Sequence, residues 1–522
     1  MTVDPAALRL VNGVLWPGFS GRTVPDWLAH ALDDGLAGVV YFGQNIDEAD
    51  TDQPARLSRA IRGIRSNALI GIDEEGGTVT RLEALRGSRF ASHAQLGRLD
   101  DLDATRRTGR MIGAQAAAAG ATVVLAPVAD VNTNPANPVI GVRSFGSDTA
   151  LVARNVAAMV RGLAESGVAA CVKHFPGHGD THTDSHLALP RLNLSWAEVQ
   201  RDHLPPFVAA IDAGVRAVMT AHIVLPHFGE LPATLNPRVL GLLREIGFEG
   251  AIVTDALDMA AIRSTFGAGP GAVRALLAGA DLLCIGNPSN LGPNQGRTTD
   301  EEDYLEVRNS LLAALDDGSI TAATLEAAGE RTAELARPAA NTTTPGTGWS
   351  TDAPARVDDS APGIDAAEND AAQTDAEGSR RIVRAAIAVR GELCPLPRAL
   401  TVIDVRDRPS FAEGPRPDVF STELALAFEL TRVVTGSAPA TALDAARAVP
   451  VGNALVVLAD RLAVPGPQSD AVHALAALRS DLVTVNAGLA ARAGSGTVID
   501  CFGGSLVTAQ VVRELLEGVV PA

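Results

Sequence analysis

The chain has 522 residues, 46% of them hydrophobic and 20% charged, and its 61 acidic and 43 basic residues give a formal net charge of −18. This length exceeds what one hydrophobic core usually supports, so we expect two domains, the first large enough to be a barrel. The acidic balance disfavours a nucleic-acid or anionic-membrane partner.

The N-terminal stretch MTVDPAALRLVNGVLWPGF lacks the basic segment, apolar core and small-residue cleavage site of a secretory signal. No run of about 18 apolar residues occurs in the sequence, so we expect a soluble, cytoplasmic protein. The four cysteines show no CxxC spacing and lie in or beside apolar runs, which predicts buried thiols without a disulfide or a zinc ribbon. They are Cys171, Cys284, Cys394 and Cys501.

Short apolar, β-branched runs recur through the first 290 residues or so, each followed by a polar turn and a helical pattern. Such runs, alternating with helices, predict a parallel sheet that is covered on both faces. Eight units in about 300 residues match a (β/α)8 barrel, whose usual size is roughly 250 residues plus insertions. The predicted strands are 10–15, 38–42, 68–72, 122–126, 168–172, 216–219, 251–254 and 281–285.

Polar residues follow these strands at their carboxyl ends. In a barrel those ends converge on one face, so residues far apart in the sequence would line a single cleft. The residues are Asp73, Asp130, Lys173, His174, His222, Asp255 and Asn287.

The sequence changes character after Ala336, the end of the predicted barrel domain (1–336). Residues 337–381 are poor in large apolar side chains and predict a linker, whose alanine-rich part near 366–380 is compatible with a helix. Residues 382–522 return to the strand–helix alternation and predict a small α/β sandwich without a catalytic constellation. Its predicted strands are 400–405, 455–459, 482–486 and 497–502, and its predicted helices are 421–433, 470–478 and 506–516.

A polar loop follows the fifth predicted strand, in VAACVKHFPGHGDTHTDSH at 168–186, and holds four histidines, two aspartates and a lysine. Such a loop on a buried strand suits proton transfer or metal binding better than packing. His178, His182 and His186 recur every four residues and would stack three metal ligands on one helix face. The proline and glycines of FPGHG disfavour that helix, and the first strand lacks the H-x-H of metal-dependent barrel hydrolases, so we expect no metal.

Asp255, in AIVTDALDM, ends a buried strand, where an unpaired carboxylate is costly unless it acts or is paired. It is the candidate nucleophile. The alternative is a helix N-cap, because aspartate favours that position and ALDMAAI has a helical pattern. The residues alone leave both interpretations open. Asp258, one turn later, is interpreted as a cap-side or solvent carboxylate.

His186 follows Asp184 by two residues, within reach of its carboxylate if the loop is extended. A carboxylate beside histidine orients the ring and raises its basicity, so the ring can hand over a proton and take it back near neutral pH. A lone loop histidine is usually polar surface, but this spacing on a barrel strand favours a functional role.

Five further residues would supply donors and acceptors to a hydroxyl-rich ligand: Asp73, Arg81, Arg143, Lys173 and His174. The alternative is a set of salt bridges in the cleft wall, in which Asp73 simply pairs with Arg81. Asp73 and Glu74 are adjacent and point to opposite sides of an extended segment, so they do not form a cooperating carboxylate pair.

Six motifs occur in order: IGIDEEGGTVTRL, APVADVNTNPANPVIGVRSFGSD, KHFPGHGDTHTDSH, VMTAHI, IVTDALDM and AGADLLCIG. They resemble the bacterial β-N-acetylglucosaminidases of glycoside hydrolase family 3 over residues 5 to about 335, and the histidine-rich string is highly specific. The linker and the last 140 residues or so resemble the second domain of some members only in their position and composition.

The resemblance implies that Asp255 is a nucleophile that forms a covalent glycosyl-enzyme intermediate, and that His186, held by Asp184, is the acid/base. It also implies that the five residues named above hold the non-reducing terminal sugar. Met259 and His222 match cleft positions to which we assign no role.

The leading hypothesis is an exo-acting, retaining β-N-acetylglucosaminidase that removes terminal GlcNAc from cell-wall fragments or chitin-type oligosaccharides, without a cofactor. Its substrate would be a GlcNAc-containing oligosaccharide or a muropeptide. A neutral imidazole does not repel an anion, so a phosphorylase that uses inorganic phosphate as acceptor is the alternative. A sugar-binding protein without catalysis is a third hypothesis, although Asp184, His186 and Asp255 are all present.

Overall fold

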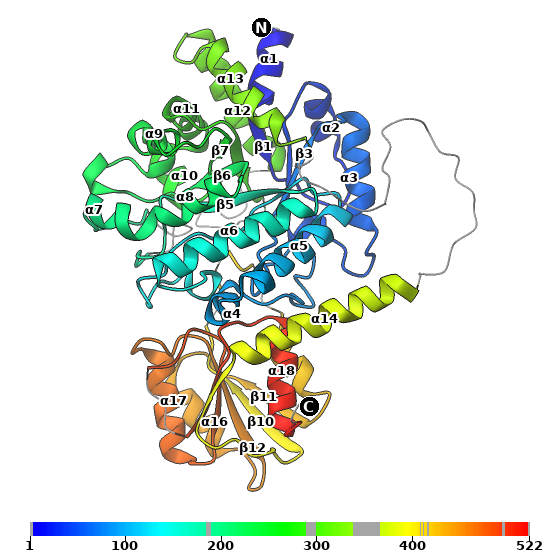
Figure 1. Ribbon diagram of the computed structural model, residues 1–522, viewed down its shortest axis with the longest axis vertical. Coiled ribbons are helices and arrows are strands. Elements are labelled where there is room, and N and C mark those ends of the chain that lie inside the picture. The colour runs from blue at the N-terminus through cyan, green and yellow to red at the C-terminus, as the bar shows by residue number, and fades with distance from the viewer. Residues whose placement is uncertain are drawn as a thin grey trace.

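The computed structural model describes residues 4–183, 189–288, 299–337, 366–407, 409–410, 412–414, 417–492 and 496–519, with the backbone alone for 366–374. Figure 1 shows two parts, one above the other along the long axis. The upper part holds the N-terminal elements as far as helix α13, and the lower part holds the sheet and helices of the C-terminal region.

Parallel strands form the centre of the N-terminal part. Six of them form one sheet in the order β2-β3-β4-β5-β6-β7, and β1 pairs with β8. A parallel bridge between Val253 and Leu282 joins the two sheets beside β7. The strands are β1 Leu15–Pro17, β2 Gly38–Tyr41, β3 Leu69–Ile72, β4 Val123–Val124, β5 Ala169–Phe175, β6 Ala217–Thr220, β7 Ala251–Val253 and β8 Leu283–Gly286.

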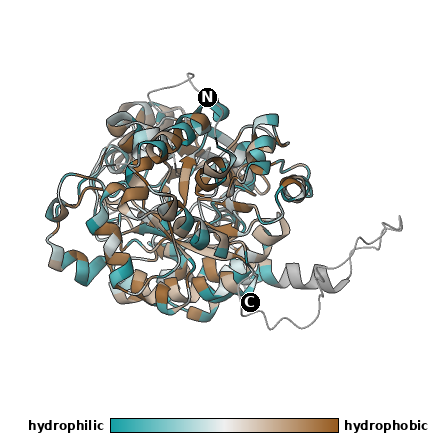
Figure 2. Cartoon of the chain, turned by 90° about the horizontal axis from the view of Figure 1, so that it is seen from above, coloured by the Kyte–Doolittle hydropathy of each residue, from teal (hydrophilic) through white to brown (hydrophobic). Residues whose placement is uncertain are grey.

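Buried side chains lie on both faces of these strands. One cluster takes members from each strand from β1 to β8, with Trp16 and Cys284 among them. The alternate residues, such as Val39 and Ile70, join a larger cluster that includes the surrounding helices. Because both faces are apolar, the strands are continuous hydrophobic runs in the sequence. Figure 2 shows hydrophobic residues on the central strands and polar residues on the outer turns of the helices.

Helices follow the strands and cover the outer face of the sheet, which confirms the predicted α/β class. Aspartate side chains cap two of the longest, Asp101 at α5 and Asp148 at α6, by accepting backbone N–H groups of the first turn. The helices are α1 Pro5–Asn12, α2 Asp26–Asp33, α3 Gln53–Ile64, α4 His93–Leu99, α5 Leu102–Ala118, α6 Thr149–Glu165, α7 Trp196–Glu198, α8 Pro205–Asp212, α9 Pro237–Glu245, α10 Ala260–Phe266, α11 Ala268–Ala278, α12 Asp300–Asp316 and α13 Ala322–Glu334.

The first predicted strand, 10–15, is wrong, whereas the other seven predicted strands overlap β2 to β8. Residues 10–12 belong to α1, which begins at Pro5 after an Asp4 cap whose carboxylate accepts the N–H of Ala6 at 3.1 Å. Aspartate before proline is a strong helix start, and it outweighs the β-branched character of the following residues. The strand begins only at Leu15.

The C-terminal part is a three-layer α/β sandwich. Its sheet has the order β11-β10-β12-β13-β14-β9, and all neighbours are parallel except β14 and β9. Separate apolar clusters pack on its two faces, one around Val402 and one around Ile403. Its elements are α14 Ala366–Ala386, β9 Ala388–Arg390, β10 Ala399–Asp404, α15 Val419–Leu424, β11 Glu429–Val434, α16 Pro439–Arg447, β12 Ala454–Ala459, α17 Pro467–Leu478, β13 Val483–Asn486, β14 Thr497–Asp500 and α18 Leu506–Glu517.

The predicted helix at 421–433 is wrong in its second half. It covers the end of α15 and most of β11, an edge strand on which no side chain is fully buried. An exposed edge strand needs no apolar alternation, so its sequence carries little strand signal. The helix suggested near 366–380 is present as α14, while β9 and α16 were not predicted.

The two parts meet through hydrogen bonds from the start of α4 to the loop after β14 and to the first turn of α18. The Ser92 hydroxyl donates to the carbonyl of Phe502, and the Gln95 side-chain amide donates to the carbonyl of Cys501 at 2.8 Å and to the Thr508 hydroxyl at 3.0 Å. Helix α14 lies beside α4 at the same junction (Figure 1).

Three of the four cysteines are buried as predicted, but Cys394 is exposed. It lies in the proline-containing connection between β9 and β10, on the surface of the C-terminal part. Among the described residues, no helix combines the length and the hydrophobicity needed to cross a bilayer.

Candidate active site

A cavity of about 850 Å³ lies at the carboxyl ends of the N-terminal strands, within the roughly 300–1,000 Å³ that is usual for small-molecule sites. Six of the predicted site residues line it: Asp73, Arg81, Arg143, Lys173, His174 and Asp255. The other two, Asp184 and His186, lie outside the described residues.

Lys173, in β5, connects two carboxylates from the loop after β3. Its ammonium group lies 2.7 Å from Asp73 Oδ1 and 2.7 Å from Glu75 Oε1. Asp73 Oδ2 also accepts a hydrogen bond from Arg81 Nη2 at 3.3 Å. Burial alone would raise the pKa of Asp73, but Lys173 and Arg81 outweigh it and lower that pKa. The predicted pairing of Asp73 with Arg81 is therefore real, but it belongs to a larger network.

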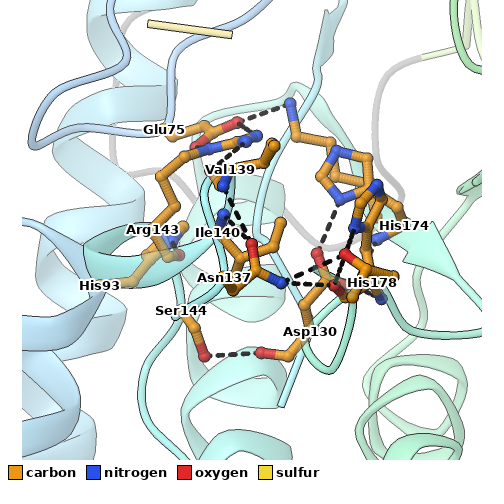
Figure 3. A network of polar contacts seen from close by, with 12 residues as sticks. Glu75, His93, Asp130, Asn137, Val139, Ile140, Arg143, Ser144, His174 and His178 are labelled. Atoms are coloured by element: carbon orange, nitrogen blue, oxygen red, sulfur yellow. Dashed lines mark hydrogen bonds and ion pairs between the residues drawn. The ribbon is translucent and has the colours of Figure 1, made fainter. Parts of the chain in front are cut away.

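Arg143 forms a bidentate ion pair with Glu75, with Nε donating to Oε2 at 2.9 Å and Nη2 to Oε1 at 2.8 Å (Figure 3). Its Nη1 donates to the carbonyl of Val139 at 3.1 Å. The His93 ring donates from Nδ1 to the Arg143 carbonyl at 2.6 Å. Burial opposes the charge of Glu75, but Arg143 and Lys173 hold its pKa well below the usual range.

The sequence analysis did not identify Glu75, although alternation along DEEGG offered a signal. Residues two apart on an extended segment face the same side, so Asp73 and Glu75 point together while Glu74 points away. Glu74 is fully buried and accepts the backbone N–H groups of Arg81 at 3.0 Å and Leu82 at 3.1 Å. This confirms that Asp73 and Glu74 do not act as a pair.

Asp130, after β4, holds His174 of β5 and His178 of the loop that follows. Its Oδ2 accepts from His174 Nδ1 at 2.7 Å, and its Oδ1 accepts the backbone N–H of His178 at 2.6 Å. Since Nδ1 of His174 is the donor, a neutral His174 ring presents Nε2 as an acceptor for a sugar hydroxyl. Figure 3 shows Asp130 beside His174 and His178.

His178 is buried, and it and His182 have different partners, while His186, the third histidine of the predicted spacing, lies outside the described residues. Burial lowers the pKa of His178 to about 4, and its Nδ1 lies 2.8 Å from the Thr181 hydroxyl. His182 instead contacts the Asn134 side chain at 3.1 Å. Across the described ranges, no group of three or more His, Cys, Asp or Glu side chains is arranged to hold a metal ion.

Asp255 lies in the loop between β7 and α10, and it is not the N-cap of α10, because Met259 occupies that position. The alternative interpretation as a helix cap is therefore wrong. Asp255 Oδ1 accepts the backbone N–H of Ala256 at 2.8 Å, and the carbonyl of Ala256 accepts from His222 Nε2 at 2.9 Å. The other nitrogen of His222 contacts the Thr234 hydroxyl at 2.8 Å, so this histidine positions the loop that carries Asp255.

Asp258 also lines the cavity. The sequence-based interpretation of Asp258 as a helix cap or a solvent carboxylate is therefore wrong. Its Oδ2 accepts the backbone N–H of Asn287 at 3.1 Å. It packs so closely on Gly286 that a Cβ there would lie 2.0 Å from Asp258 Oδ1. Only glycine fits at this end of β8.

The C-terminal part contributes residues 409–410 and 412–414 to the cavity wall. Arg81 Nη2 donates to the carbonyl of Ala412 at 2.9 Å, and Nη1 donates to that of Glu413 at 3.4 Å. Arg81 therefore bonds both to Asp73 in the cavity and to the C-terminal part. Nothing in the local sequence predicts these contacts, because they join residues more than 300 positions apart.

Comparison with known proteins places this geometry in a family. The profile described as the glycosyl hydrolase family 3 N terminal domain matches residues 17–335. The chain is 37% identical over 276 residues to a β-hexosaminidase of Stenotrophomonas maltophilia (strain K279a), covering 50% of this chain and 79% of the relative. It is 35% identical over 289 residues to β-hexosaminidase A of Pseudoalteromonas piscicida, of which the match spans 48%.

The same result comes from solved structures. A glycoside hydrolase family 3 β-N-acetylglucosaminidase from Paenibacillus sp. str. FPU-7 superposes with a TM-score of 0.79 at 30% identity, covering 98% of this chain and 97% of that one. The chain therefore belongs to glycosyl hydrolase family 3 and is a glycoside hydrolase.

Proposed function

We propose that this glycoside hydrolase is an exo-acting, retaining β-N-acetylglucosaminidase that removes terminal GlcNAc from cell-wall fragments or chitin-type oligosaccharides. The names of its relatives support a GlcNAc-containing glycoside as substrate. The observation that carries the finer assignment is the position of Asp255 in the same cavity as the network of Asp73, Lys173 and Arg143.

In the proposed reaction, Asp255 attacks C1 of the terminal sugar while the leaving oxygen takes a proton. The bond between C1 and that oxygen breaks, and a covalent glycosyl-enzyme forms. Water then attacks C1, gives up a proton and releases Asp255, so the β configuration is retained. We assign both proton transfers to His186, oriented by Asp184.

The sugar would be held by the remaining predicted residues. Carboxylate oxygens of Asp73 and donors on Arg81, Arg143 and Lys173 offer charged hydrogen bonds to hydroxyl groups, which are stronger than neutral ones. The ion-paired side chains line the cavity, and residues 412–414 form part of its wall. Exo action would follow if the non-reducing terminal sugar is held among these charged groups.

Two architectural assignments belong to this proposal. We assign the eight parallel strands to a closed (β/α)8 barrel, supported by the buried cluster that takes members from all of them. We also assign residues 1–336 to the catalytic domain, 337–381 to a linker and 382–522 to the C-terminal domain. The cytoplasmic location stays a prediction from the sequence.

The test is the stereochemistry of hydrolysis. The protein is incubated with 4-nitrophenyl N-acetyl-β-glucosaminide, and the first-formed sugar is followed by proton NMR before it equilibrates. We expect the β anomer to appear first. Initial release of the α anomer would refute retention, and no release of nitrophenol would refute the activity.

A further inference from the structure

The start of helix α4 lies where the two parts of the molecule meet. Ser92 caps this helix by accepting the backbone N–H of Gln95 at 3.2 Å, and the side-chain oxygen of Gln95 accepts the backbone N–H of Ser92 at 2.9 Å. The same two side chains donate hydrogen bonds to the C-terminal part, at the carbonyls of Phe502 and Cys501. The pair of residues that caps α4 is therefore also held by the C-terminal part.

The C-terminal side of this junction fits closely against α4. Phe502 has a φ angle of 54°, a left-handed conformation that is rare for a bulky side chain and persists only where the surrounding structure fixes it. Its ring lies against the guanidinium group of Arg98, with 4.6 Å between Cζ and the ring centroid. The Gln95 amide also donates to the buried Thr508 hydroxyl at 3.0 Å. A change in the C-terminal part at this junction would therefore reach the first turn of α4.

The segment that leads into α4 also contacts the loop that carries Glu75. Gly77 donates its backbone N–H to the carbonyl of Phe90 at 3.2 Å. A Cβ at Gly77 would lie 2.7 Å from Ser92 Cβ, so only glycine allows this approach. Gly77 follows Glu75 by two residues, and the Glu75 carboxylate pairs with Arg143 in the cavity wall. The position of Glu75 therefore depends on the start of α4.

His93, the first residue of α4, holds the other partner of this ion pair (Figure 3). Its ring donates from Nδ1 to the backbone carbonyl of Arg143 at 2.6 Å and packs on Phe145, with the ring centroids 4.4 Å apart. His93 is 2% exposed, and burial lowers its pKa to about 4, so the ring is neutral at pH 7. Among the described residues, its Nε2 atom has no hydrogen-bond partner. A buried acceptor without a partner costs free energy, and the bond to Arg143 accounts for a histidine at this position.

We propose that His93 is a positioning residue of the sugar site, and that the C-terminal part sets the affinity of this site for the terminal sugar through α4. The inference rests on the proposed function, in which Arg143 holds that sugar. Of the described residues that line the cavity of about 850 Å³, none belongs to α4. His93 and Gln95 therefore act on the sugar through Arg143 and Glu75, and not by contact.

The first test changes the C-terminal part alone. Thr508→Val removes an acceptor of the Gln95 amide and should raise KM for 4-nitrophenyl N-acetyl-β-glucosaminide about threefold at unchanged kcat, because Arg143 binds the sugar equally in the ground state and the transition state. Thr484→Val, on β13, is the matched control and should keep the wild-type KM. Thr484 is buried, and within the described structure its hydroxyl has no hydrogen-bond partner. An unchanged KM in Thr508→Val overturns the coupling through α4.

The second test replaces the imidazole. His93→Leu removes the donor to the Arg143 carbonyl and should raise KM about tenfold, with kcat within about twofold of wild type. His93→Asn places an amide N–H where Nδ1 donates, so KM should return to within about twofold of wild type. A purely structural role of His93 would reduce the fraction of active enzyme, so kcat would fall at an unchanged KM.

Two results would overturn the positioning role of His93: a wild-type KM in His93→Leu, whether or not kcat falls, or an equal rise of KM in His93→Leu and His93→Asn. A wild-type protein that releases no nitrophenol would instead refute the proposed function. The two failures are therefore distinguishable.

Discussion

The N-terminal and C-terminal parts face each other through the same kind of surface, the carboxyl ends of parallel strands, yet they use charged residues there differently. In the N-terminal part, Lys173 joins Asp73 and Glu75 in the wall of a cavity of about 850 Å³. In the C-terminal part, the buried Asp500 accepts from the Asn486 amide at 2.7 Å, from the backbone N–H of Ala491 at 3.0 Å and from Arg390.

The difference teaches that charged strand ends do not by themselves mark an active site. Asp404 and Asp500 are fully engaged in holding loops of their own sheet together. Asp73 and Glu75 also form ion pairs, but their side chains line an open cavity. Contact with a cavity, and not the presence of ion-pair partners, therefore separates a binding role from a structural role, and substitutions on the two faces should separate these roles too.

The largest effect is expected at the proposed nucleophile. Asp255→Asn removes the charge that attacks C1, so kcat on the nitrophenyl glycoside should fall on the order of 10⁴-fold or more. Asp500→Asn, its counterpart in the other sheet, should lower the free energy of unfolding by about 1–3 kcal/mol and leave kcat unchanged. Steady-state kinetics and urea unfolding measure both. Comparable kcat losses in the two variants would contradict the comparison.

The next effect concerns the acid/base. His186→Ala should lower kcat by about 10²- to 10⁴-fold with poor leaving groups, because they depart only after protonation. Good leaving groups, such as dinitrophenol, should lose much less. The C-terminal His473, whose Nδ1 contacts the carbonyl of Ser469, is the matched control, and His473→Ala should keep both rates. Equal losses of kcat with good and poor leaving groups in His186→Ala would refute the acid/base role of His186.

Breaking a buried ion pair should lower stability in either part of the molecule, but it should weaken substrate binding only in the N-terminal part. Glu75→Gln leaves Arg143 without its bidentate partner, so the free energy of unfolding should fall by about 3–5 kcal/mol and KM should rise. Asp404→Asn weakens the pairs with Arg406 and Arg432 and should cost similar stability at unchanged KM. A raised KM in Asp404→Asn would show that the second face also touches the terminal sugar.

The smallest effect is a pH dependence of stability. Burial raises the pKa of Glu74 to about 7 from 4.5, so the folded protein keeps a proton that the unfolded chain loses between these values. Stability from this group is present below about pH 4.5 and is lost as the pH rises through about 7, by about 3 kcal/mol. As the pH rises from 5 to 8, the free energy of unfolding should therefore fall less in Glu74→Gln than in wild type.

Urea unfolding at the two pH values measures this difference. Glu326→Gln, an exposed change on α13, should follow the wild-type pH dependence. An identical pH dependence in wild type and Glu74→Gln would mean that Glu74 is already ionised in the folded protein.

Much of the fold could be predicted, because buried parallel strands are continuous apolar runs. Strands β2 to β8 were found for that reason, and so were β10 and β12 to β14. Two of the wrong predictions have clear physical causes. Residues 10–12 are apolar on a short capped helix rather than on a strand, and β11 is an edge strand whose exposed side chains give no pattern.

Part of the candidate site could be predicted because its residues lie at or just after the end of a predicted strand. Asp73, Lys173 and Asp255 were identified in this way and line one cavity. Glu75 and Asp258 were not, because their roles depend on partners that the fold brings from elsewhere, Arg143 for Glu75 and the backbone of Asn287 for Asp258. Residues 412–414 of the cavity wall come from the C-terminal part, and nothing in their own sequence predicts that they reach the cavity.

Arg81 donates one N–H group inward, to Asp73, and others outward, to carbonyl groups at 412 and 413. A polypeptide shortened to its first domain would leave the outward donors to water and free the side chain to swing. Such a shortened chain would lack the contacts that fix Arg81 in the cavity wall. An exchange of segments between relatives would have to move the segment around Ala412 together with the N-terminal part whose cavity it lines.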